Sequence, residues 1–136
     1  MKHTISRWIA VGLILVFLSA CRGGAQIYEV KSAPVPSPSG KELTLEQVRK
    51  EIMAAGVAAG WQMTDVKPGE LLATYNIRSH QAIVAIPYTT KNYSILYKDS
   101  SNLKYDAAAK TIHQNYTGWI QRLDSAIRSR LSAAGM

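Results

Sequence analysis

The spacing of apolar residues predicts a helix that begins just after Leu43. Thr44 and Gln47 match a capping box, in which each side chain bonds a free backbone N–H of the first helical turn. Gly56 and Gly60 are the expected stop signals. The apolar positions of this segment recur three and four residues apart, as on one face of a helix, at Leu45, Val48, Ile52 and Ala55.

From Trp61 onward the apolar positions alternate, which is typical of β-strands. Residues 79–81 are the expected hairpin connection between the second and third strands, and the Ser-rich stretch around Ser100 is a predicted turn. Strands joined by such short connections pair antiparallel. Four strands are predicted in this way, at residues 61–66, 71–77, 82–86 and 93–97.

A second amphipathic helix is predicted near the end of the chain. Its apolar positions follow the helical period at Ile112, Tyr116, Trp119, Ile120, Leu123, Ile127 and Leu131. The predicted fold class is therefore α+β, with an N-terminal helix, a four-stranded antiparallel meander, and a C-terminal helix packed on one sheet face. We assign this single domain to residues 43–136.

Residues 21–42 have the composition of a tether. Pro34, Pro36 and Pro38 alternate with other residues, which favours an extended, polyproline-like spacer without internal hydrogen bonds. Residues 27–30 alternate like a strand. They either add an edge strand to the domain or belong to the linker, and the pattern alone leaves both interpretations open.

Residues 1–20 have the pattern of a secretory signal peptide. Lys2 and Arg7 precede an apolar run that ends in the small residues Ser19 and Ala20. The run is shorter than the roughly 20 apolar residues that a membrane-spanning helix needs. A cleaved signal is therefore favoured over a retained anchor helix.

The end of this segment, Leu18-Ser19-Ala20-Cys21, resembles the lipobox of bacterial lipoproteins. The resemblance implies a diacylglycerol thioether on Cys21, cleavage before it, and acylation of the new amino group, with palmitate among the expected acyl chains. This covalent lipid is the only cofactor-like group that we expect. Arg22 stands where an inner-membrane retention signal usually has Asp, so the resemblance favours the periplasmic leaflet of the outer membrane. A plain signal peptide that ends at an unmodified cysteine is the alternative.

The composition narrows the classes of site and partner. The chain has 136 residues, 16 Lys plus Arg, 9 Asp plus Glu and one Cys, with a formal net charge of +7. One cysteine excludes an intramolecular disulfide and a multi-cysteine zinc site. An excess of positive charge suits anionic lipid headgroups or cell-wall polymers. Nucleic acid is not an expected partner of an exported, lipid-anchored protein.

The sequence contains no recognisable catalytic or metal-binding motif. His80 lies in a predicted turn and His113 near the second helix, without the spacing of a metal-binding pair. We interpret His113 as a surface or capping residue. Ser100 has no glycine-flanked nucleophile elbow around it. We therefore assign no catalytic residue and no metal ligand, and do not expect an enzyme.

Aromatic and basic residues are the remaining candidates for binding. Tyrosines in strands are commonly half-buried core residues, but on an uncovered sheet face they would stack on a sugar or a peptide. The basic residues of the strands and the following loop are either a solvated face or a surface for acidic partners; they include Lys104 and Lys110. The candidate binding surface combines the two sets and consists of Arg78, Tyr88, Lys91, Tyr97 and Lys98.

The sequence as a whole favours a membrane-anchored periplasmic lipoprotein whose small domain is a binding or envelope-assembly module. An envelope protein or a cell-wall polymer is the expected partner. A ligand-binding domain for peptide, glycan or lipid is the alternative, followed by a small hydrolase. Residues 100–105, together with the apolar positions of the second helix, resemble small uncharacterised lipoproteins of proteobacteria. That resemblance implies no activity, substrate or catalytic residue.

Overall fold

A computed structural model describes residues 24–136 and has an α+β fold. The predicted signal peptide and Cys21 lie outside the described residues. In the part that is described, no helix is long and apolar enough to cross a membrane. The elements in chain order are β1 (Ala25–Gln26), β2 (Val30–Pro34), α1 (Leu45–Ala58), β3 (Gln62–Lys67), β4 (Glu70–Ile77), β5 (His80–Pro87), β6 (Asn92–Ser101), β7 (Thr111–Ile112) and α2 (Asn115–Ala134).

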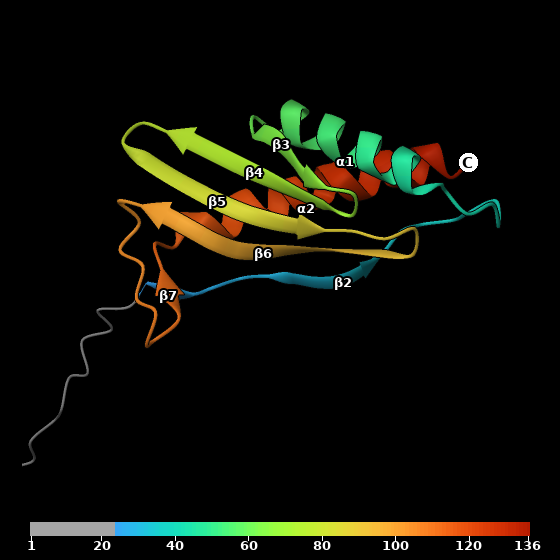
Figure 1. Ribbon diagram of the computed structural model, residues 1–136. Helices are drawn as coiled ribbons and strands as arrows, with labels where there is room; N and C mark the ends of the chain where they lie inside the picture. The colour runs from blue at the N-terminus through green and yellow to red at the C-terminus, as the bar shows by residue number, and fades with distance from the viewer. Residues whose placement is uncertain (1–23) are drawn as a thin grey trace, which may run out of the picture.

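The main sheet is antiparallel and has five strands in the order β2-β6-β5-β4-β3 (Figure 1). The predicted meander corresponds to β3, β4, β5 and β6. Its second turn is shorter than expected, because His80 already pairs with Ile77 and only Arg78 and Ser79 connect the strands. The expected turn at Ser100 is wrong, because β6 continues past Tyr97 to Ser101.

The fifth strand, β2, comes from residues that the sequence assigned to a tether. Val30 and Ala33 are buried, and they pair with Ile95 and Tyr93 of β6. The strand therefore covers Val30–Pro34 rather than residues 27–30, and the folded part of the chain starts before Leu43. Pro34 is its last residue, at the edge of a sheet, where a missing backbone N–H leaves no ladder bond unmade.

A small second sheet joins β1 to β7, with Ala25 opposite Ile112. Ile112 therefore belongs to a strand, and the prediction that it opens the second helix is wrong. The helix begins at Asn115 instead. These two short strands lie at the same end of the molecule as the turn between β4 and β5 (Figure 1).

The predicted capping box at the start of α1 is confirmed. The Thr44 backbone N–H donates to Gln47 Oε1 at 2.8 Å, and the Gln47 N–H donates to Thr44 Oγ1 at 3.2 Å. The helix does not end at Gly56, as the sequence suggested, but runs on to Ala58. At Gly56 the missing side chain leaves room for the thioether of Met63 on β3. Gly60, with φ of 89°, follows the end of the helix.

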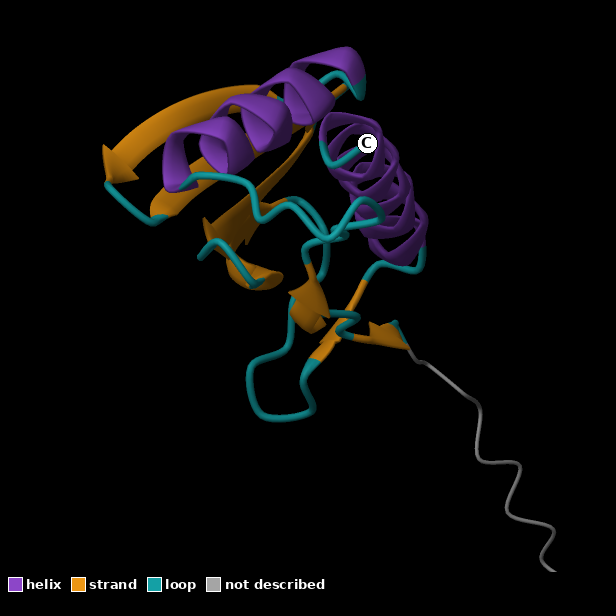
Figure 2. Cartoon of the chain, turned by 90° about the vertical axis from the view of Figure 1, so that its right-hand side faces the viewer, coloured by secondary structure: helices purple, strands orange, loops and turns teal. Residues whose placement is uncertain are grey.

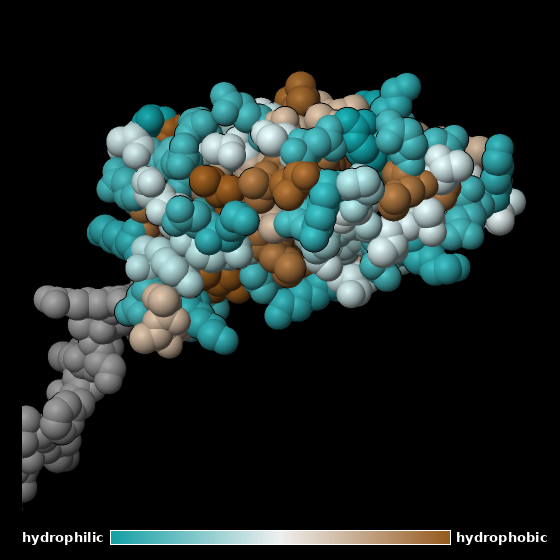
Figure 3. All heavy atoms as spheres, viewed as in Figure 1, coloured by the Kyte–Doolittle hydropathy of each residue, from teal (hydrophilic) through white to brown (hydrophobic). Residues whose placement is uncertain are grey.

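Both helices lie on the same side of the main sheet (Figure 2). They pack against each other and bury the apolar residues of that sheet face between them. The opposite face is covered by no described element, and apolar side chains lie among polar ones on it (Figure 3). The largest fully buried side chains of the core include Ile52, Leu71, Ile86, Tyr93, Ile95, Tyr116, Leu123 and Ile127.

Candidate functional site

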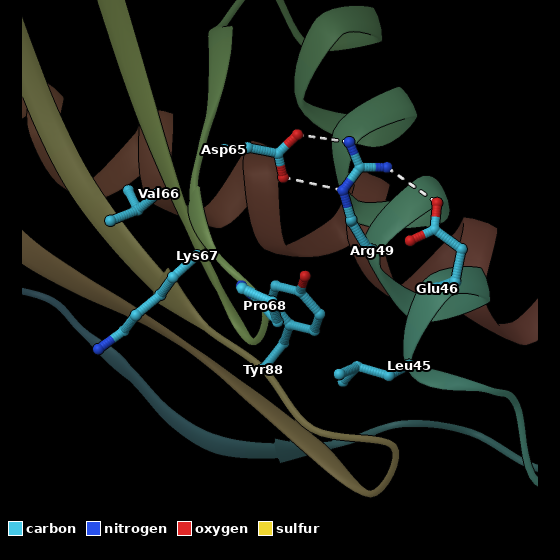
Figure 4. A pocket seen from close by; sticks show the side chains of 8 residues that line it. All are labelled: Leu45, Glu46, Arg49, Asp65, Val66, Lys67, Pro68 and Tyr88. Carbon is cyan, nitrogen blue, oxygen red and sulfur yellow. Dashed lines mark hydrogen bonds and ion pairs between the residues drawn. The ribbon is translucent and has the colours of Figure 1, made fainter.

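A hollow of about 440 Å³ lies between the first turn of α1 and the end of β3 (Figure 4). We call it the α1–β3 groove. Helix α1 lines one wall of the groove, the β3–β4 hairpin lines the other, and a tyrosine that follows β5 lies between them. The lining residues are Leu45, Glu46, Arg49, Asp65, Val66, Lys67, Pro68 and Tyr88.

A charge network joins the two walls of the groove. Arg49 Nε donates to Asp65 Oδ1 at 2.8 Å, and its Nη2 bonds the second oxygen of the same carboxylate. Arg49 Nη1 donates to Glu46 Oε1 at 3.0 Å. The hydrogen bond from the guanidinium holds the pKa of Asp65 below its ordinary value, and the same bond raises the pKa of Arg49. Asp65 therefore stays ionised at neutral pH and is unsuited to donate a proton there.

The rest of the groove is largely apolar. Tyr88 is buried and forms part of its lining, whereas Leu45 is 38% exposed at the mouth. Figure 4 shows Tyr88, Pro68 and Leu45 grouped below the Arg49–Asp65 pair, with the side chain of Val66 directed away from α1. Removal of exposed apolar surface from water lowers the free energy, so a partner that covers Leu45 and Val66 is favoured.

The groove lies beside an open edge of the sheet. Strand β3 is last in the strand order and pairs only with β4. All of its residues except Met63 are exposed. Its pairing with β4 is regular from Gln62 to Asp65, and the register shifts between Asp65 and Lys67. Backbone groups on the outer side of such a strand are available to pair with another extended chain.

The Arg49–Asp65 pair predicts an acid-dependent loss of stability. A carboxyl whose pKa is lowered in the folded state contributes stability that is fully present above its unfolded pKa, about 4, and is lost as the pH falls through the folded value. We expect Asp65→Asn to lower the unfolding temperature modestly at neutral pH. The difference from the wild type should be smaller at pH 3 than at neutral pH, because Asp65 begins to protonate in acid.

Thermal unfolding of the wild type and the variant at both pH values checks this expectation. Asp99→Asn is the matched control, because the Asp99 carboxylate forms no ion pair with any described residue. A difference for Asp65→Asn that persists undiminished in acid would contradict the role of the ion pair.

The structure does not bring the five residues of the predicted binding surface together. Arg78 lies in the β4–β5 turn at one end of the sheet. Tyr88 and Lys91 lie at the other end, where Lys91 Nζ is 3.7 Å from Glu42 Oε1. Tyr97 and Lys98 lie on β6 between the two ends. Of the five, only Tyr88 lines the α1–β3 groove.

The two tyrosines do not form an aromatic platform on the open sheet face. Tyr88 is buried. Tyr97 pairs with the buried Val84, and its ring meets Tyr116 of α2 edge-on at 6.0 Å between centroids. Tyr97 also stacks on Tyr105 at 4.3 Å. Both tyrosines therefore pack as core residues, Tyr88 buried and Tyr97 half-buried.

The two histidines that the sequence treated separately are neighbours, with ring centroids 6.1 Å apart. His80 Nδ1 lies 2.7 Å from the carbonyl oxygen of Asn102. His113 Nδ1 accepts from the backbone N–H of Asn115, the first residue of α2, at 3.2 Å, although the N-cap residue itself is Gln114. Across residues 24–136, no three His, Cys, Asp or Glu side chains are grouped as a metal ion would require.

Sequence reasoning missed the residues that carry the groove. Arg49 lies outside the apolar face predicted for the first helix, Asp65 lies within the first predicted strand, and no local pattern couples the two residues. Their contact depends on how α1 packs over β3.

Comparisons of the chain with protein-family models, with curated proteins and with solved structures found no match.

Proposed function

We propose that this protein is a lipid-anchored envelope protein whose domain binds an extended polypeptide segment of another envelope protein at the α1–β3 groove. The bound segment adds as a strand to β3 and places an apolar side chain in the groove. The observation that carries the proposal is an open strand edge directly beside an apolar hollow. Strand addition gains affinity from backbone hydrogen bonds and specificity from pockets that take alternate side chains.

The chemistry of the groove defines the segment that it accepts. The charges of Arg49, Asp65 and Glu46 already satisfy one another, so a charged side chain would have to disrupt that network. Leu45 and Tyr88 instead favour an apolar side chain. The regular stretch from Gln62 to Asp65 limits the added strand to a short one. Attachment of the lipid at Cys21 keeps the domain at the membrane, and the proposal requires no catalytic step.

Selection of short random peptides on the purified full chain tests the proposal. We expect enriched peptides to alternate apolar and polar residues and to bind with a Kd on the order of 10 μM, as weak short-strand interactions do. Leu45→Asp should weaken binding about tenfold, because it places a charge at the mouth of the groove. Asp is tolerated at this position, since an acidic residue in the first turn of a helix is favourable.

Val57→Asp is the matched control, because it changes an exposed apolar residue of the same helix that does not line the groove. Hydrogen exchange reports the mode of binding: backbone N–H groups of β3 that face away from β4 should exchange more slowly with peptide bound. Peptides that bind Leu45→Asp as tightly as the wild type, or that leave β3 exchange unchanged, would refute the proposal.

A further inference from the structure

We propose that the end of the domain that carries β1 and β7 docks on anionic phospholipid headgroups of the membrane that holds the anchor. We call this end the β1–β7 end. The inference rests on the proposed attachment through Cys21, and it adds an orientation: the α1–β3 groove is held on the side of the domain that faces away from the bilayer.

The path of the chain provides the first argument. Only three residues separate Cys21 from Ala25, the first residue of β1. An extended chain spans at most about 3.6 Å per residue, so the lipidated cysteine lies within roughly 15 Å of β1. The start of the fold is positioned by two contacts: Ala25 pairs with Ile112, and the Ile27 N–H donates to the Lys110 carbonyl at 2.9 Å. An anchor at Cys21 therefore brings the β1–β7 end close to the headgroups.

The charge of this end provides the second argument. Three acidic residues lie at or beside this end, and their carboxylates already have local partners. Glu29 pairs with Lys31 and accepts from the Tyr97 N–H, Asp99 accepts from the Ser100 N–H, and Asp106 accepts from Ala108 and Ala109. The remaining basic side chains of this end form no ion pair with any described residue. They are therefore available to lipid phosphates. These basic residues are Arg78, Lys104 and Lys110.

The backbone at these residues provides the third argument. Arg78, Lys104 and Lys110 have φ angles of 53°, 52° and 53°, in the left-handed region that glycine adopts most easily. A long cationic side chain at such a position is a local cost to the fold. Strain of this kind is retained where the side chain has a role outside the fold. Of the five described non-glycine residues with positive φ, the three that are charged all lie at this end, which is consistent with a shared role for their charge.

Hydrogen bonds and an aromatic contact hold the surface together. Asn102 Nδ2 donates to Ser79 Oγ at 2.9 Å, which ties the turn that carries Arg78 to the loop that carries Lys104. Tyr105 is 41% exposed and is supported by its stacking on Tyr97. Exposed tyrosines beside basic residues suit the headgroup region, because the ring is apolar and the hydroxyl is polar.

The groove lies at the opposite end of the sheet from β1 and β7. The β3–β4 turn at Pro68 and the start of α1 are at the far end of the domain from the strands where the chain enters (Figure 1). A domain that docks through its β1–β7 end therefore presents the groove to the space beyond the membrane. A partner there has access to β3 without competing with the lipid surface.

Lysine footprinting of the full-length lipidated chain tests the docking. The chain is reconstituted in vesicles of phosphatidylethanolamine with phosphatidylglycerol, or of phosphatidylcholine alone, and acetylated with a water-soluble reagent. We expect Lys104 and Lys110 to react about fivefold more slowly in the anionic vesicles, and this protection to fall at high salt. Lys67 and Lys91, at the groove end, are the internal controls, with side chains 68% and 79% exposed. Equal reactivity in the two vesicle types would overturn the proposal.

A double variant separates docking from folding. Arg78→Gly and Lys104→Gly together remove two charges at positions where glycine fits the backbone, so the unfolding temperature should not fall. Lys110 remains as the reporter, and its protection in anionic vesicles should be largely lost. Protection of Lys110 that survives undiminished in the variant would refute a charge-based surface.

The mass of the N-terminal peptide reports separately whether Cys21 carries lipid. A chain found without the lipid would refute the proposed attachment at Cys21, and with it the proposed orientation of the domain at the membrane. The lysine comparison, repeated with that chain and excess anionic vesicles, would then decide whether the β1–β7 end binds headgroups at all. Peptide binding at the groove is measured without vesicles, so failure of the groove proposal is seen independently.

Discussion

A chain truncated to residues 43–136 is expected to unfold at a temperature about 10–20 °C lower than the chain that retains β2, or not to fold at all. The truncation removes Val30 and Ala33 from the core and uncovers Ile95 and Tyr93 on β6. Burial of a valine alone contributes about 1.5–3 kcal/mol. With the lost backbone pairing, the total loss is roughly 3 kcal/mol or more, a large share of the 5–15 kcal/mol that holds a typical domain.

Circular dichroism during thermal unfolding measures this effect, and point variants localise it. Val30→Asp places a charge in the core and should destabilise nearly as much as the truncation. Ser32→Asp is the control on the same strand, because Ser32 is exposed and its left-handed φ of 50° is one that Asp tolerates. If the truncated chain unfolded at the wild-type temperature, residues 30–34 would be a tether after all.

Tyr93→Phe is expected to lower the free energy of unfolding by about 1–3 kcal/mol. The Tyr93 hydroxyl donates to Asp124 Oδ1 at 2.6 Å, and Asp124 is only 7% exposed. Burial, followed by this hydrogen bond, raises the pKa of Tyr93 well above its ordinary value. Without the hydroxyl, the carboxylate keeps only the bond from Arg128 Nε at 2.9 Å and lacks a buried donor.

Tyr116→Phe is the matched control for this variant. Its hydroxyl is also buried but has no hydrogen-bond partner among the described residues. Removing an unsatisfied buried hydroxyl is expected to leave stability unchanged or raise it by up to about 1 kcal/mol. Denaturant unfolding of both variants measures the difference. Equal destabilisation by the two substitutions would mean that loss of packing, and not the bond to Asp124, determines the effect.

Elements that depend on neighbouring residues could be predicted from the sequence. The capping box at Thr44 and the hairpins between β3 and β6 involve short separations along the chain, so the local pattern contains the information. β2 was ambiguous for the opposite reason. Its partner β6 is separated from it along the sequence by more than half of the domain's length, and the proline-rich segment that follows β2 has the composition of a linker. Pro34 is compatible with a strand only because β2 lies at an edge.

The candidate surfaces also combine features that local sequence indicates with features that only long-range contacts determine. Arg78 and Lys98 were singled out for their charge, but only the topology separates them from Lys91 at the far end of the sheet. Arg49 and Asp65 were not singled out, because their contact is set by helix-on-strand packing rather than by spacing. Composition thus indicated which residue types to consider, and the fold determined which of them are neighbours.

The short pairing of β1 with β7 determines how the domain would respond to a pulling force. With the proposed anchor at Cys21 and the proposed partner at the groove, a pulling force would enter the fold at Ala25. Gly24 packs so closely against the Ile112 carbonyl that any side chain there would overlap it. Because β1 has only two residues, it would still detach before the long strands of the main sheet shear. Under tension, release of β1 would lengthen the segment between the anchor and the domain, while the core and the α1–β3 groove stay intact.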